Sequence, residues 1–101
     1  MAKPTFSIRT AGAVRVVSFE CPGGVSTPPE FAEAVEEMAS QLPGDTGVIV
    51  DGRGPIWGYA MIVHAAHSTP FVATRDPRLG VVIVANHTTD HHVGEVIDFP
   101  E

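Results

Sequence analysis

The 101-residue sequence contains one cysteine, one tryptophan, one tyrosine and only six basic residues. The single cysteine, Cys21, excludes an internal disulfide framework and a zinc site built from cysteines. The first ten residues lack the apolar core of a signal peptide, and no apolar run approaches the roughly 20 residues needed to cross a bilayer. We therefore expect a cytoplasmic protein that does not bind membranes.

Positive charge is also scarce, since six basic residues against twelve acidic ones give a net charge of −6. This balance argues against binding to DNA or to other long nucleic acids, whose affinity comes from many Lys and Arg contacts to phosphates. It is compatible with a short oligonucleotide held in a pocket by two or three arginines. Arg53, Arg75 and Arg78 lie in one short stretch that is suited to this role. With 44% hydrophobic and 18% charged residues, the chain is expected to associate with further copies of itself.

The hydrophobic pattern predicts an α/β fold: a small single domain over 1–101 with a mixed β-sheet, an N-terminal hairpin, one βαβ unit and about two helices. Thr27 is expected to cap the first helix, in which Phe31, Val35 and Met38 form an apolar stripe. Pro70 ends the second helix, because the residue before a proline disfavours helical geometry. The predicted elements are strands 5–9 and 13–19, helix 28–42, strand 47–50, helix 56–67, strands 71–74 and 80–85, and an edge strand 95–99.

The turn formed by Gly52, Arg53, Gly54 and Pro55 is the first candidate for chemistry. A strand that runs through glycines into a helix presents backbone N–H groups and the positive end of a helix dipole to an anion. Pro55 suits the first helical position, and Arg53 adds a guanidinium that matches phosphate geometry. An ordinary tight turn with a solvated arginine is an equally open interpretation of these four residues.

Two histidines on the second predicted helix are the next candidates. His64 and His67 are three residues apart and therefore share a face, where they can hold a metal or transfer protons. Histidines on an apolar helix are more often simply packed and hydrogen-bonded. We favour His67, because it lies in the last turn beside Ser68, from which a side chain is expected to reach the mouth of the sheet.

Three further features have strong structural explanations. Asp76 and Arg78 flank a proline and offer a carboxylate and a guanidinium, but a β-turn in which Asp76 bonds its own backbone explains the same residues. The segment 87–92 contains three histidines and is typical of a solvated loop, although His87 at a strand end is a candidate for a supporting role. Trp57 and Tyr59 can stack on bases, but aromatic residues at a helix start are more often core or subunit contacts.

Three segments in this order resemble one known family: GRGPIW, a histidine-bearing helix ending in HSTPFVA, and DPRLG followed by an apolar strand. They resemble the small manganese-dependent CRISPR-associated ring nucleases of type III systems, whose members stand alone or are fused to an ATPase-like domain. The resemblance covers residues 47–87 and weakens toward both ends.

The resemblance implies a metal-dependent phosphodiesterase that cleaves the second messenger cyclic tetra-adenylate to short linear oligoadenylates, which switches off type III antiviral signalling. It implies homodimers, two of which sandwich one ring and extend into filaments. His67 of one dimer then acts on a ring held by Asp76 and Arg78 of another. These three are the implied catalytic residues, with Mn²⁺ as cofactor and His67 and Asp76 as its ligands. The predicted ligand-binding residues are Gly52, Arg53, Gly54, Pro55, His64 and Ser68.

This chain departs from the family pattern at one position, and two other functions are alternatives to ring cleavage. Family members can carry two adjacent histidines before Thr-Pro-Phe, whereas this chain has His67 followed by Ser68, which puts its rate of cleavage in doubt. A non-catalytic sensor or sponge for the ring would need Arg53 and Arg78 but would tolerate His67→Ala. A metal-dependent exoribonuclease acting on adenylate tails would prefer linear over cyclic oligoadenylate.

Overall fold

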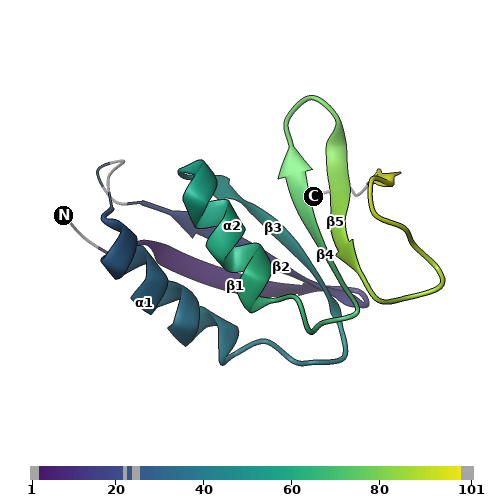
Figure 1. The fold of residues 1–101 in the computed structure, drawn as a ribbon, viewed down its shortest axis with the longest axis horizontal. Helices are drawn as coiled ribbons and strands as arrows, with labels where there is room; N and C mark the ends of the chain where they lie inside the picture. Colours follow the sequence, from purple (N-terminus) through teal and green to yellow (C-terminus); the bar gives the residue numbers. More distant parts are fainter. Residues whose placement is uncertain (1–2, 22, 24–25, 99–101) are drawn as a thin grey trace.

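The computed structural model describes residues 3–21, 23 and 26–98, which form a mixed sheet and two helices (Figure 1). Within these residues the strands follow one another across the sheet in sequence order. The pairs β1–β2, β4–β5 and β5–β6 are antiparallel, and β2–β3 and β3–β4 are parallel. The elements are β1 (Thr5–Ala11), β2 (Val14–Glu20), α1 (Pro28–Ala39), β3 (Gly47–Arg53), α2 (Ile56–Ala65), β4 (Phe71–Asp76), β5 (Gly80–Asn86) and β6 (Val96–Ile97).

The predicted α/β class, the N-terminal hairpin and the two helices are confirmed. The structure adds a second βαβ unit, because β2 and β3 are parallel neighbours joined by α1, just as β3 and β4 are joined by α2. Parallel crossovers are right-handed in nearly all proteins. Two successive crossovers that move across the sheet in the same direction therefore place their helices on the same face of the sheet. Figure 1 shows α1 and α2 side by side on one face of the sheet.

Both helices end earlier than their patterns predict. Helix α1 ends at Ala39, because the next residues close a tighter turn in which Gln41 N–H donates to Met38 O and Leu42 N–H to Ala39 O. Helix α2 ends at Ala65, so His67 lies in the turn beyond it. The predicted edge strand 95–99 is reduced to β6, and its residue 99 lies outside the described residues.

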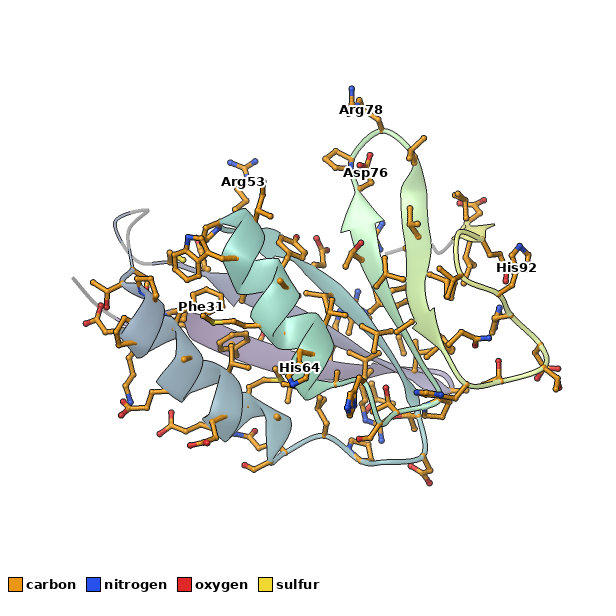
Figure 2. The ribbon with its side chains drawn as sticks, viewed as in Figure 1. Phe31, Arg53, His64, Asp76, Arg78 and His92 are labelled. Carbon is orange, nitrogen blue, oxygen red and sulfur yellow. The ribbon has the colours of Figure 1, made fainter. Side chains whose placement is uncertain are left out.

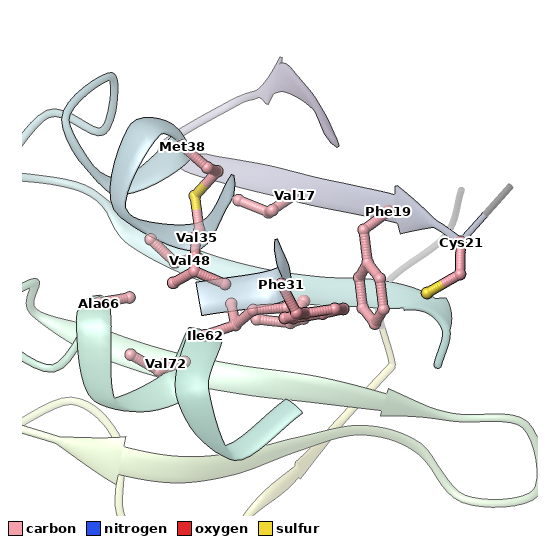
Figure 3. Close-up of a cluster of buried hydrophobic side chains, with 11 residues drawn as sticks. Val17, Phe19, Cys21, Phe31, Val35, Met38, Val48, Ile62, Ala66 and Val72 are labelled. Atoms are coloured by element: carbon pink, nitrogen blue, oxygen red, sulfur yellow. The ribbon is translucent and has the colours of Figure 1, made fainter. Parts of the chain in front are cut away.

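A hydrophobic core fills the space between the sheet and the helices (Figure 3). Phe31, Val35 and Met38 of α1 are buried as their spacing predicted, together with Ile62 of α2. The Phe31 ring packs edge-on against Phe19 of β2 at 5.7 Å between centroids. This contact joins α1 to the carboxyl end of β2, next to the end of β3. A second buried cluster lies on the other face of the sheet and comprises Val16, Ile49, Phe71, Ala73, Val81 and Ile83.

The first turn of α1 is fixed by a capping box that makes its stability sensitive to acid. Thr27 N–H and Oγ1–H donate to Oε1 of Glu30 at 3.2 and 2.9 Å, and Glu30 N–H donates back to Thr27 Oγ1. These hydrogen bonds lower the pKa of Glu30 below its ordinary 4.5. A lowered carboxyl pKa contributes stability that is present above the ordinary value and is lost as pH falls through the folded-state pKa.

We therefore expect Thr27→Ala to lower the free energy of unfolding by about 1 kcal/mol at neutral pH. The deficit should shrink as the pH falls below 4.5, because protonated Glu30 has lost its charge and accepts these bonds more weakly. Denaturant unfolding at several pH values measures this effect. Ser26→Ala is the control, since Ser26 Oγ only makes a long 3.5 Å contact with Thr27 O. Equal deficits for Thr27→Ala at neutral and acid pH would contradict the coupling.

Candidate functional site

The parallel strands β3 and β4 separate before they end, and a cleft lies between them. They pair only at Val48–Val72, Ile49–Ala73 and Val50–Thr74. Beyond that point β3 continues along β2 as far as Arg53, and β4 continues along β5 as far as Asp76. We call this opening the fork. Its cleft has a volume of about 730 Å³ and is lined by Asp51, Gly52, Arg53, Gly54, Tyr59, Thr74, Arg75, Asp76 and Pro77.

The glycine-rich segment lies at the fork, but its backbone differs from the predicted turn. Gly52 and Arg53 belong to β3 rather than to a turn, because β2 continues to pair with them through Phe19 and Glu20. Pro55 is the N-cap of α2, one position earlier than predicted, with extended φ and ψ of −72° and 158°. The helix therefore begins beside the cleft, and exposed Arg53 stands at the same end (Figure 2).

The Tyr59 hydroxyl replaces β4 as the hydrogen-bonding partner of Gly52. Gly52 N–H donates to Tyr59 Oη at 3.1 Å, and Tyr59 O–H donates to Gly52 O at 2.5 Å. Both backbone groups are thereby satisfied where the ladder to β4 has ended. Burial raises the pKa of the Tyr59 phenol, so the hydroxyl stays protonated and can donate. The ring packs edge-on against Phe19 at 5.2 Å, so Tyr59 is a core contact rather than a stacking platform for bases.

A partly buried ion pair crosses the fork. Arg75 Nε lies 3.2 Å from Asp51 Oδ2, and the two side chains are 21% and 33% exposed. From the sequence, Arg75 was named only as one of three arginines suited to an anionic ligand, and its pairing with Asp51 was not predicted. Each directly follows the paired part of its strand, one step beyond the neighbouring pair Val50–Thr74. A predicted parallel register for these two strands would have placed Asp51 and Arg75 side by side.

Asp76 shapes the turn that carries Arg78. Its Oδ1 accepts hydrogen bonds from the backbone N–H groups of Arg78 and Leu79 at 2.8 and 3.0 Å, and these bonds lower the pKa of Asp76 below 3.8. The interpretation as a β-turn closed by its own aspartate is thus confirmed. Arg78 stands exposed at the tip of the β4–β5 hairpin, above the fork (Figure 2). The ionised Asp76 therefore holds the turn that presents this guanidinium.

Three histidines gather at the other end of the domain, where β4 begins and β5 ends. The rings of His64 and His67 are 5.3 Å apart between centroids. His87 follows β5, and its Nε2 donates to the backbone carbonyl of His67 at 2.8 Å. We call His64, His67 and His87 the histidine cluster. His67 and the following Ser68 are both exposed, so they are open to a partner or ligand.

The fork and the histidine cluster lie at opposite ends of the same strands. Helix α2 starts at the fork and runs back to the histidine cluster, and β4 returns from the cluster to the fork. The five steps from Phe71 to Asp76 alone span roughly 17 Å at the usual rise of a strand. Figure 2 shows His64 at one end and Asp76 and Arg78 at the other. The expectation that His67 reaches the mouth of its own sheet is therefore wrong.

The proposed metal ligands do not converge within one chain. His67 and Asp76 are separated by the length of β4, and no group of three or more His, Cys, Asp or Glu in the described residues is placed to hold a metal ion. The described residues of a single chain thus do not bring the implied manganese ligands together. A site that uses both His67 and Asp76 requires two copies of the chain.

Comparison with known proteins identifies one family. The sequence model of the family described as "CRISPR-associated protein (Cas_csx3)" matches residues 29–98, a range that includes the fork and the histidine cluster. A protein of Aquifex aeolicus (strain VF5), described as uncharacterized, is 43% identical over 54 residues. The match covers 52% of this chain and 49% of that relative, so the chain spans about half of the relative's length. Among the described residues, no helix is long and apolar enough to cross a membrane.

Proposed function

Because this chain belongs to the CRISPR-associated Csx3 family, we propose that it is a ring nuclease of type III systems. The proposed reaction is cleavage of cyclic tetra-adenylate to short linear oligoadenylates. The observation that carries the proposal is the arrangement of side chains along the strands, with arginines at one end and histidines at the other. Each end holds half of what phosphodiester cleavage requires.

The fork suits an anionic ligand although the protein is acidic. Three of the six basic residues, Arg53, Arg75 and Arg78, lie in the fork or on the hairpin above it. Guanidinium groups recognise phosphate oxygens through paired hydrogen bonds. A cyclic tetranucleotide carries four phosphates in near four-fold symmetry, so a symmetric assembly can present the same arginines to it several times.

The proposed active site lies between copies of the chain. Stacking the histidine cluster of one copy on the fork of another brings His67 to a ring held by Arg78, which one chain cannot do. In the proposed assembly homodimers pair around the ring, and further stacking produces filaments. This arrangement ties cleavage to binding, because the ligand itself joins the two halves.

Each residue of the proposed site is assigned one role in the cleavage reaction. His67 transfers a proton to or from the reacting oxygens, a role that suits an exposed imidazole. Arg78 neutralises charge that develops on the phosphate. Asp76 positions Arg78 through its turn, and His87 positions His67 through the backbone carbonyl. The same groups serve attack by a ribose 2′-OH or by water.

Manganese dependence is proposed only for the assembled protein. A bound divalent cation would supply positive charge at the phosphate, and its protein ligands, His67 and Asp76, would come from different copies. Weak binding of Mn²⁺ by the unassembled chain and tighter binding with ring present is the expected pattern. Calorimetric titration of Mn²⁺ into the His67→Ala protein with bound ring separates this site from incidental binding by the loop 87–92.

The first experiment is incubation with cyclic or linear tetra-adenylate, with Mn²⁺ or with a chelator, followed by chromatography and mass spectrometry. We expect the ring to be cut to linear di-adenylate faster than linear tetra-adenylate is shortened, and the chelator to suppress cleavage. Retention of intact ring in stoichiometric amounts would replace the enzyme with a sensor or sponge. Faster shortening of the linear substrate would identify an exoribonuclease.

A further inference from the structure

The ion pair between Asp51 and Arg75 lies within the fork, where a ligand would have to pass. Both side chains line the cleft and are mostly shielded from solvent. Partly buried charges are screened by salt less than surface charges are. The cleft's volume of about 730 Å³ is within the range of pockets that bury small ligands. A charged pair inside such a cleft affects how strongly a charged ligand binds there.

The pair places a guanidinium next to an anionic oxygen inside the cleft, since Arg75 Nε and Asp51 Oδ2 are 3.2 Å apart. A guanidinium that neighbours a carboxylate can also bind a phosphate, because it recognises the oxygens of both groups. Arg53 stands on the neighbouring strand at the same opening. A phosphodiester in the cleft would thus meet a second guanidinium in addition to Arg75.

We propose that Arg75 is a phosphodiester-binding residue of the fork and that Asp51 is its internal counterion, which the bound phosphodiester displaces. This inference rests on the proposed function, because it assigns the fork to the same oligoadenylate. In the empty protein Asp51 holds Arg75 in place across the opening. When the ligand binds, its phosphate replaces Asp51 as the partner of Arg75. Repulsion between the phosphate and the Asp51 carboxylate then lowers the affinity for the ligand. Asp51 thereby favours release of the product.

The test compares binding affinities in a His67→Ala background, which prevents turnover of the probe. Calorimetric titration with cyclic and with linear tetra-adenylate is made for Arg75→Gln, Asp51→Asn and the double variant Asp51→Asn/Arg75→Gln. The double variant guards against misfolding, because it removes both charges of the ion pair together and leaves neither without the other. Lys3→Gln and Glu37→Gln are charge-matched controls, since Lys3 pairs with Glu33 and Glu37 on the outer surface of α1.

We expect Asp51→Asn to tighten binding by about fivefold and Arg75→Gln to weaken it about tenfold or more, since a hydrogen bond to a charged group is worth more than a neutral one. Arg75→Gln should also reduce the slope of log affinity against log salt by about 0.7, the value for one lost phosphate contact on a single strand. A merely structural role for Arg75 would leave this slope unchanged.

The outcomes separate this inference from the proposed function. If the wild-type protein cleaves the ring but both fork variants bind it as the controls do, the inference is overturned and the ring nuclease stands. If the affinities shift as expected while the wild-type protein cleaves nothing, the inference stands and the enzymatic function fails. Absence of binding to either probe in all variants overturns both.

Discussion

Mixing two inactive variants, His67→Ala and Arg78→Ala, is expected to restore cleavage of cyclic tetra-adenylate. Alone, His67→Ala should lose about 10²–10⁴-fold in rate, because it lacks the group proposed to transfer the proton. Arg78→Ala should lose stabilisation of the developing phosphate charge. The two residues lie at opposite ends of β4, so each variant retains the half that the other lacks.

The expected recovery can be estimated from the assembly. If junctions form at random in an equimolar mixture, roughly a quarter of them unite an intact histidine cluster with an intact fork, since each site takes one end from each copy. Cleavage rates measured across mixing ratios should therefore peak near equal amounts. The control mixture pairs His67→Ala with the double variant His67→Ala/Arg78→Ala, which cannot complement it. An inactive equimolar mixture of properly assembled variants would show that His67 and Arg78 must come from the same copy, which contradicts a site shared between copies.

The fold was predictable to the extent that local patterns determine it. The cap at Thr27 and the apolar stripe of Phe31, Val35 and Met38 predicted α1, and both are present. The class and the hairpin followed from short apolar runs and turn residues. The extents of strands did not, because Gly52 and Arg53 read as a turn by residue type. Their place in β3 depends on pairing with β2, a contact between segments far apart in the sequence.

The candidate residues were predictable by type, but their arrangement was not. His67, Asp76 and Arg78 could be named as candidates from their residue types, yet nothing in their spacing reveals that α2 runs away from the fork. The pairing of Asp51 with Arg75 was missed because an ion pair across a parallel ladder is visible only once the register is known. The sequence favoured a core or subunit contact for Tyr59, as its packing against Phe19 shows, but it did not predict that the Tyr59 hydroxyl bonds the backbone of Gly52.

Gly52→Ala is expected to destabilise the domain and to distort the fork at the end of β3. A Cβ at position 52 would lie 2.5 Å from both the backbone oxygen and the Cδ1 of Phe19. The oxygen belongs to the neighbouring strand and cannot move away as a flexible side chain can. The Phe19 ring is also held on its other sides by Phe31 and Tyr59. Overpacking of this kind typically costs about 1–3 kcal/mol of the free energy of unfolding.

The same substitution should weaken ligand binding more than its effect on stability alone explains. Displacing Phe19 or the β3 backbone disturbs both hydrogen bonds between Gly52 and Tyr59, which keep the polar groups of β3 satisfied where β4 departs. Gly44→Ala is the matched control, because a Cβ there meets nothing within 4 Å. Denaturant unfolding and ring binding below the melting temperature should both be near wild type for Gly44→Ala. If Gly52→Ala is destabilised but binds the ring normally, the fork does not depend on the Gly52–Tyr59 contact and the ligand must be held elsewhere.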